Sequence, residues 1–161
     1  MAKQSVPPTV GYMEKSRRYY EAQGFEIPYT WAHFDEVPFT RLAKPLADAT
    51  VAILTTSSLH ERAASDPREV ASGSTIEPPA RLYANDLSWD KRATHLDDLN
   101  SYFPIDHLKA LVDEHRIGRL AERFHCVPTE YSQRRTMTSD APELLKRCRE
   151  DGVDVALLVP L

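Results

Sequence analysis

The sequence contains few cysteines and few glycines, and it has no long hydrophobic run. Its only cysteines, Cys126 and Cys148, are 22 positions apart, which is neither a CxxC pair nor the ligand spacing of a zinc site. We therefore expect two reduced thiols, no metal and a cytoplasmic protein. No stretch approaches the roughly 18 consecutive apolar residues of a membrane helix. Residues 1–8 lack the apolar core of a signal peptide, so we expect no membrane partner.

The chain also lacks an excess of basic residues. Its 20 Lys and Arg stand against 24 Asp and Glu, which gives a net charge of −4. Nucleic-acid binding needs a basic surface that neutralises phosphates, so we expect no nucleic-acid partner. The 12 prolines against 5 glycines predict stiff rather than flexible connections.

The length of 161 residues suits one domain with a long irregular arm. Prolines interrupt residues 1–49 and leave room for one short helix over Tyr12–Ala22. The stretch Trp31–Phe39 is too rich in apolar side chains for a free tail. We therefore predict an aromatic N-terminal arm over 1–49 that wraps over an α/β domain at 50–161.

Several segments of the domain have recognisable local patterns. The uninterrupted apolar run Val51–Thr56 predicts a strand covered on both faces. The charged, aperiodic residues 60–80 predict a surface loop, and Arg81–Ala84 a short strand. Residues 105–116 predict a helix, because Pro104 precedes them and their apolar residues fall on one stripe. Gly118 is expected to end that helix in a left-handed conformation.

The C-terminal third predicts a second helix followed directly by a strand. Asp140 is expected to cap the helix with Glu143 at capping-box spacing, Pro142 falls in its first turn, and Gly152 ends it. The apolar run 153–159 then forms a buried strand. The order predicts an open, mostly parallel α/β sheet flanked by helices, of the doubly wound type but incomplete. In it, 51–56 and 153–159 are parallel neighbours, and both helices pack on the sheet.

The sequence stops at Leu161, at the carboxyl end of its most hydrophobic strand. A buried strand normally needs a crossover helix after it to cover one face. Two explanations stay open here: a small domain with a C-terminal edge strand, or a longer chain that was truncated. Either way, we expect one face of the last strand to be exposed, or to be covered by the arm or another subunit.

Three sets of segments together carry a family resemblance. They are Tyr12–Tyr20 with Trp31–Asp35, Thr94–Asp106 with Arg116–Gly118, and Glu150–Leu161. The most specific parts are Asn-x-x-Phe-Pro-Ile-Asp over 100–106 and the strand after Asp-Gly-Val-Asp at 151–154. Together they resemble the glycine/sarcosine/betaine reductase selenoprotein B family, which includes the selenocysteine subunit of D-proline reductase. The resemblance covers most of the chain.

The resemblance implies a chemistry that this sequence does not itself contain. In the family, selenocysteine, or cysteine in some members, follows the strand that corresponds to Val155–Leu161. Because selenocysteine is encoded by UGA, the sequence ends where a UGA read as stop would end it. The resemblance further implies reductive cleavage of a C–N bond in an amino acid or N-methylated glycine derivative, and a dithiol reductant. A pyruvoyl-containing partner subunit is also implied, with a homo-oligomer as the other possibility. No further cofactor is expected.

Site candidates lie where polar side chains follow strands or precede helices. Thr55, Thr56 and Ser57 end the first strand, and could hold a substrate carboxylate or serve only as turn residues. His95 is a candidate acid or base for the leaving amine. Cys126 would need exposure and a cationic neighbour to react, and its apolar flanks favour a buried thiol instead. The remaining candidates for substrate binding are Asp97, Asp98, Asn100 and Arg134. For each of them, the alternative is a capping role or a surface position.

Two functional hypotheses remain from the sequence. The first is a selenoprotein-type reductase subunit whose nucleophile lies beyond Leu161, so that the 161-residue form is inactive. The second is a non-enzymatic α/β module that binds a partner through its aromatic arm. The codon that follows Leu161 distinguishes the two hypotheses.

Overall fold

The computed structural model describes residues 11–25, 27, 33–37, 40–63, 65–84, 95–130 and 132–160. The chain forms two compact units, residues 1–38 and 39–161. The division therefore lies at Pro38, and residues 39–49 belong to the α/β unit rather than to the predicted arm. Trp31 and Phe39, on which the predicted wrapping partly depends, lie outside the described residues.

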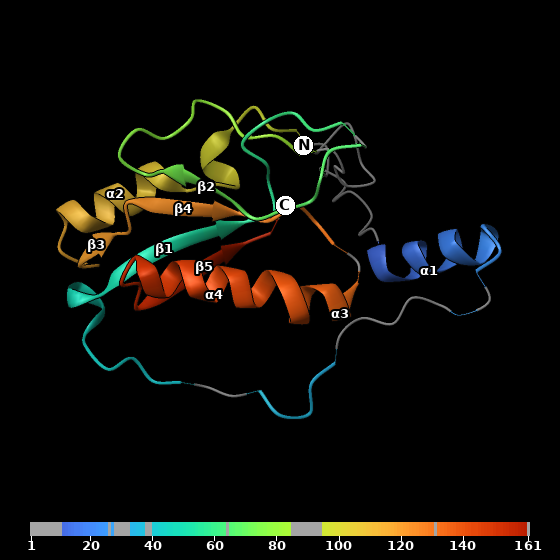
Figure 1. Ribbon diagram of the computed structural model, residues 1–161, viewed down its shortest axis with the longest axis horizontal. Helices are drawn as coiled ribbons and strands as arrows, with labels where there is room; N and C mark the ends of the chain where they lie inside the picture. The colour runs from blue at the N-terminus through green and yellow to red at the C-terminus, as the bar shows by residue number, and fades with distance from the viewer. Residues whose placement is uncertain are drawn as a thin grey trace, which may run out of the picture. The chain divides into compact units, whose positions relative to one another are not determined.

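The first unit contains the predicted helix, and the second is a five-stranded α/β sheet with helices (Figure 1). No helix in the described part of the chain is long and apolar enough to cross a membrane. The elements in chain order are α1 (Tyr12–Ala22), the 3-10 turn η1 (Leu46–Asp48), β1 (Thr50–Thr55), β2 (Ala71–Ser74), the 3-10 turn η2 (Leu99–Ser101), α2 (Ile105–Asp113), β3 (Arg119–Leu120), β4 (Arg123–Cys126), α3 (Gln133–Arg135), the π-turn η3 (Thr136–Asp140), α4 (Ala141–Glu150) and β5 (Val155–Val159).

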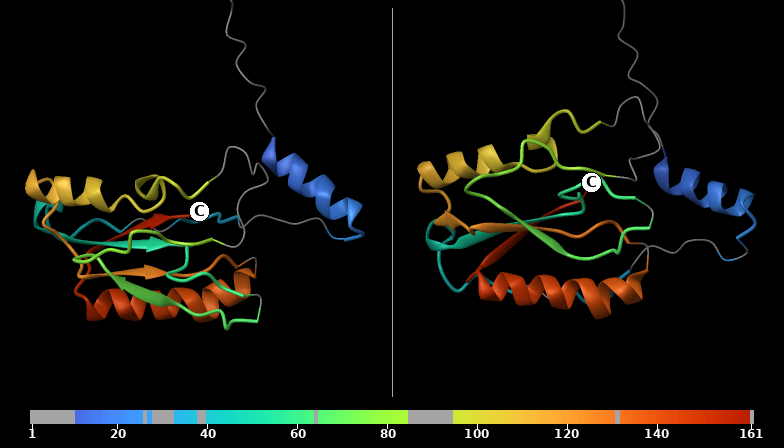
Figure 2. Two further views of the ribbon diagram at one scale, coloured as in Figure 1. Left: turned by 90° about the horizontal axis from the view of Figure 1, so that it is seen from above. Right: turned by 45° about the horizontal axis from the view of Figure 1, so that its top comes forward.

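The sheet is centred on β1, every residue of which is buried. Along one side, β1 pairs in parallel with β5, and on the other with β3 at its start and β4 at its end. The predicted parallel pairing of the first and last strands is therefore confirmed. The left view of Figure 2 shows the strands in the order β5, β1, β4, β2.

The two predicted helices cover opposite faces of this sheet (Figures 1 and 2). Ile105 and Leu108 of α2 join Phe103 and Phe124 in the larger core cluster. On the other face, Cys148 of α4 packs against a smaller cluster with Ala52 and Leu54 of β1. The open, mostly parallel α/β sheet is thus confirmed, and the chain between β4 and β5 crosses from one side of β1 to the other through α4.

The prediction of a surface loop over 60–80 is wrong for residues 71–74. Residues 71–74 form β2, which pairs antiparallel with β4 from Ala71↔Cys126 to Ser74↔Arg123. This strand has no apolar alternation, because its residues are small. A Cβ at Gly73 would lie 2.5 Å from Cε1 of Phe124, so glycine is what lets the buried ring lie across the strand. Of the predicted strand Arg81–Ala84, only an isolated bridge between Tyr83 and Ser58 is formed.

The end of α2 is also different from the prediction. His115, not Gly118, adopts the left-handed conformation, with φ 55°. Gly118 instead allows the backbone at 118 to approach the backbone of Asp48 closely, because a Cβ there would lie 2.6 Å from the carbonyl carbon of Asp48. At the end of α4, Gly152 has φ 63° as predicted, and the N–H of Val153 donates to the carbonyl of Cys148 in a Schellman turn.

The start of the last helix lies earlier than Asp140. Ser132 is the capping residue, and its Oγ accepts from the N–H of Arg135. From there the backbone runs through α3 and the π-turn η3 into α4, so Asp140 has helical angles and makes no capping hydrogen bond. Pro142 cannot donate to the backbone ladder, and the wider π-turn before it accommodates this loss.

Candidate functional site at the carboxyl edge of the sheet

The carboxyl ends of three parallel strands lie side by side. Thr55 at the end of β1 pairs with Cys126 of β4 on one side and with Val159 of β5 on the other. Neighbouring strands lie about 4.8 Å apart, so the ends of β4 and β5 are about 10 Å apart. The chain leaves β1 through a long loop to β2, and leaves β4 toward α4. In open α/β sheets, ligands bind at the carboxyl edge between two such strands.

A pocket of about 200 Å³ lies at this position. The segment between β1 and β2, from Ser58 to Ala71, forms almost all of its lining, and Pro128, which follows β4, completes it. His60 contributes an imidazole, and the sequence pattern did not single it out. Arg62 donates to the carbonyls of Asp66 and Pro67, which fixes one wall of the pocket.

The hydroxyl groups at the end of β1 are used within the turn. Thr55 and Ser57 are both buried, and Thr55 Oγ1 lies 3.0 Å from Ser57 Oγ and accepts from the Ser57 N–H. Thr56 is half-buried. The turn-residue alternative thus accounts for the side chains of Thr55 and Ser57, and neither is exposed to a substrate.

Cys126 is buried beside this turn. Burial raises the pKa of its thiol to about 12, although a hydrogen bond with Ser57 opposes the shift. The thiol is therefore protonated at neutral pH and is no nucleophile, because the thiolate is the reactive form. Cys148 packs under α4, and burial raises its pKa as well.

The polar segment before α2 is organised by local hydrogen bonds. Asp98 caps η2 by accepting from the Asn100 N–H. Asn100 in turn donates to the Asp106 carboxylate and accepts from the Asp106 N–H, which ties η2 to the first turn of α2. His95 Nδ1 accepts from the N–H of Asp97 at 3.3 Å, and the imidazole is exposed. The four predicted site residues of this segment are His95, Asp97, Asp98 and Asn100. No hydrogen bond or ion pair that the structure describes joins their side chains to Thr55 or Ser57.

Arg134 lies on α3 and is exposed. Its carbonyl accepts from Thr138 Oγ1, whereas its guanidinium makes no hydrogen bond or ion pair with the described residues. Within the described residues the guanidinium is therefore available for an anion.

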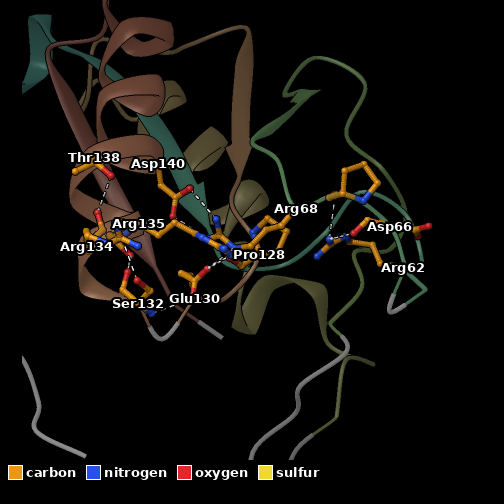
Figure 3. A network of polar contacts seen from close by, with 12 residues as sticks. Arg62, Asp66, Arg68, Pro128, Glu130, Ser132, Arg134, Arg135, Thr138 and Asp140 are labelled. Carbon is orange, nitrogen blue, oxygen red and sulfur yellow. Dashed lines mark hydrogen bonds and ion pairs between the residues drawn. The ribbon is translucent and has the colours of Figure 1, made fainter.

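Sequence reasoning missed a part-buried ion-pair network next to Arg134 (Figure 3). Arg68 donates to both carboxylate oxygens of Asp140, at 2.7 and 2.8 Å, and to the carbonyl of Pro128. Glu130 accepts from the Ser132 N–H and from Arg135. Those contacts, the backbone N–H first, lower the pKa of Glu130. The network joins the loop before β2 to the residues after β4. It therefore holds these two connections together.

A second polar cluster missed by sequence reasoning lies under α4. Ser72 Oγ accepts from Arg147 Nη1 at 2.8 Å and lies 2.9 Å from His125 Nδ1. Since arginine only donates, the Ser72 hydroxyl can direct its proton to Nδ1, and in that tautomer the neutral imidazole of His125 carries its proton on Nε2. That nitrogen has no hydrogen-bond partner and lies 3.5 Å from the Asp151 carboxylate. Burial lowers the pKa of His125, although the charge of Asp151 opposes the shift.

This burial predicts a pH-dependent stability. His125 stays neutral in the folded protein below pH 6.5, the ordinary pKa at which the unfolded chain becomes protonated. The unfolded state then binds more protons, so stability falls as the pH falls through and below 6.5. We expect the free energy of unfolding in urea to decrease between pH 7.5 and 5.5, and to decrease less in His125→Gln. The control His107→Gln, on an exposed position of α2, should keep the decrease. An equal decrease in both variants would show that the buried imidazole of His125 does not cause the pH dependence of stability.

Comparison with known proteins adds no family to this description. No family model matches the chain, and no curated protein or solved structure is significantly similar to it.

Proposed function

We propose that this chain is the sheet-forming part of a selenoprotein-type reductase that cleaves the C–N bond of an amino acid or an N-methylated glycine derivative. The observation that carries the proposal is the parallel register of β5 with β1 through Thr55↔Val159. A residue in the turn after β5 therefore lies beside the end of β1, about 10 Å from the end of β4 and its pocket. The family resemblance of 94–106 and 150–161 supports a selenocysteine at that turn.

The chemistry of the proposal is balanced by a dithiol. A selenolate attacks the carbon next to the substrate carboxylate, the Se–C bond forms, and the C–N bond breaks as the amine leaves with its electron pair. A dithiol then supplies two hydrogens and two electrons, one hydrogen to carbon and one to selenium, and becomes a disulfide. The dithiol requirement and the two free thiols favour a cytoplasmic location within this proposal. A pyruvoyl-containing subunit is its expected protein partner.

The described residues offer one part of this site by themselves. Arg134 presents a free guanidinium after β4 and suits a substrate carboxylate. The pocket beside the segment between β1 and β2 is large enough for a small amino acid, since a water molecule occupies about 30 Å³ and the pocket about 200 Å³.

The test begins with the codon after Leu161. We expect an in-frame UGA followed by coding sequence. The chain extended through that codon should release amine from glycine, sarcosine or betaine, or open the ring of D-proline, only when a dithiol is present. A cysteine in place of selenocysteine should retain less activity, and the 161-residue chain should have none. A UAA or UAG codon, or activity of the 161-residue chain, would refute the proposal.

The alternative is a non-enzymatic module that binds a partner, for which the sequence indicates the aromatic arm and the described sheet offers a second surface. β5 is an edge strand in the described sheet and exposes Leu157 and Leu158. Partner binding through this edge needs no chemistry at the carboxyl ends, so the amine-release assay separates the two functions.

A further inference from the structure

A serine, a histidine and an aspartate lie in contact with one another under α4. Ser72 of β2 is the register partner of His125 of β4, so the two side chains lie on the same face of the sheet. Ser72 Oγ is 2.9 Å from His125 Nδ1, and Nε2 of the same ring is 3.5 Å from a carboxylate oxygen of Asp151. A hydroxyl within hydrogen-bond reach of a base, with a third group that orients the base, is the arrangement that activates a serine nucleophile.

The imidazole of His125 and the carboxylate behind it are both fixed. His125 is completely buried, and its Nε2 has no hydrogen-bond partner among the described residues. Arg123 holds the Asp151 carboxylate, because its Nε and Nη2 donate to it at 2.7 to 3.1 Å. Buried polar atoms without a partner are rare in folded proteins, and a base that gains a proton during a reaction is one reason to keep such an atom beside a carboxylate.

A polar pocket of about 570 Å³ reaches this cluster. Arg147 lines the pocket, and its Nη1 donates to Ser72 Oγ at 2.8 Å. Val70, two positions before Ser72, lines it as well. Ser72 itself is only half-buried, so a small molecule in the pocket can approach its hydroxyl. The volume lies within the range of ligand pockets.

We propose that Ser72, His125 and Asp151 form a second site, which hydrolyses small carboxylic esters. Ser72 Oγ attacks the ester carbonyl carbon and forms a C–O bond, while its proton passes to His125 Nδ1. The imidazolium returns this proton to the alcohol oxygen as the ester C–O bond breaks. Water then attacks the acyl-serine by the same route, and the carboxylic acid and the free Ser72 hydroxyl are released.

Arg147 and Asp151 have different roles in this scheme. The guanidinium of Arg147 lies beside Ser72 Oγ, where its positive charge stabilises the negative charge that develops on the carbonyl oxygen. Asp151 is a positioning residue, because it contacts the imidazole and not the substrate, and its charge stabilises the imidazolium. The inference is independent of the proposed reductase function, since ester hydrolysis needs neither selenocysteine nor a dithiol and releases an alcohol.

Hydrolysis of p-nitrophenyl acetate by the 161-residue chain tests the site. We expect release of p-nitrophenol, and a rate lower by about 100-fold or more in Ser72→Ala and in His125→Gln. The matched controls are Ser74→Ala, an exposed serine of the same strand, and His107→Gln, an exposed imidazole of α2. Both controls should keep the native rate. A native rate in Ser72→Ala would overturn the proposal.

Covalent labelling tests the nucleophile in the native chain, without a substitution that could affect folding. A fluorophosphonate reacts with activated serine hydroxyls, so it should modify Ser72, as located by peptide mass spectrometry. It should leave Ser72 unmodified in His125→Gln, because the base is missing. An unmodified Ser72 in the native chain would overturn the proposal.

The pH dependence of hydrolysis tests the role of Asp151. Burial lowers the pKa of His125, although the charge of Asp151 opposes the shift, so the rate should fall only below about pH 6.5, the ordinary pKa of histidine. Asp151→Asn removes the opposing charge and should move the midpoint to lower pH. The other charged groups that face the imidazole are retained in this variant: Arg123, Arg147 and Glu143. An unchanged midpoint would show that Asp151 does not act on the base, and would overturn its assignment.

Discussion

Replacing Phe124 by alanine is expected to lower the free energy of unfolding by about 4 kcal/mol, the cost of truncating a fully buried aromatic side chain. Phe124 is completely buried, and its ring centroid lies 4.4 Å from that of Phe103. Both rings belong to the core cluster between the sheet and α2. Because domains of this size are stable by about 5–15 kcal/mol, the loss is a large share of the total. Urea unfolding followed by circular dichroism measures it.

Gly73 supplies a specific control for this position. In the native protein, Gly73→Ala should be destabilising by about 1–3 kcal/mol, because the new methyl group overlaps the Phe124 ring. In the Phe124→Ala background the ring is gone, so the same change should cost little. The two substitutions should therefore be non-additive by at least about 1 kcal/mol. Additive effects would show that Gly73 is needed for its backbone rather than for the ring.

The pair Gly73 and Phe124 also shows why β2 could not be predicted from the sequence. Strand prediction depends on alternating or continuous apolar residues, and residues 71–74 are small or polar because a ring from β4 fills the space beside them. The information that specifies β2 thus lies some 50 positions away, in the partner strand 123–126. By contrast, β1, β5, α2 and α4 are recognisable because their signals are local: apolar runs, a helical stripe and Gly152.

The candidate site was predictable only in its location. The order of strands and helices predicts ligand binding at the carboxyl edge, and a pocket lies beside the segment that follows β1. The individual side chains were less predictable, because Thr, Ser, Asp and Asn serve equally as turn and capping residues. Asp98 and Asn100 are used in that way, and Thr55 and Ser57 bond to each other. Arg68 was missed because its carboxylate partner is 72 positions away.

Asp140 illustrates how a local signal can mislead. Its position before Pro142 and Glu143 matches a capping box, yet its carboxylate is directed toward Arg68. Ser132, eight positions earlier in the sequence, ends the chain's irregular stretch and caps the helix instead. Glu143 pairs with Arg147 one turn later. A charged partner from a distant loop thus outweighs a local capping preference.

Replacing Asp140 by alanine should consequently have a much larger effect than removal of a helix cap. The Asp140 side chain is 8% exposed and that of Arg68 is 18% exposed, so the substitution leaves a largely buried guanidinium without its carboxylate. Breaking a buried pair in this way costs about 3–5 kcal/mol, whereas losing a cap costs about 1 kcal/mol. We expect a loss of about 3 kcal/mol in urea unfolding at neutral pH, because Arg68 keeps its bond to the Pro128 carbonyl.

Two further variants separate the ion pair from simple loss of packing. Asp140→Asn retains an oxygen acceptor and should cost less than Asp140→Ala. The double variant Asp140→Leu with Arg68→Met removes both charges, and should be closer to the native stability than either single change, because no buried charge is left unpaired. Lys146→Ala breaks an exposed pair with Glu150 on the same helix and should change stability by less than about 0.5 kcal/mol.

The expected consequence for the carboxyl edge follows from what the ion pair connects. Arg68 precedes β2, Pro128 follows β4, and Asp140 ends the π-turn, so the pair fixes the two connections that flank the end of β4. In Asp140→Ala, amide hydrogen exchange should accelerate in residues 66–70 and 127–130 by more than in β1 and β5, since the local opening no longer breaks a buried pair. Uniform acceleration across the sheet would show that Asp140 contributes to global stability alone and does not hold this edge.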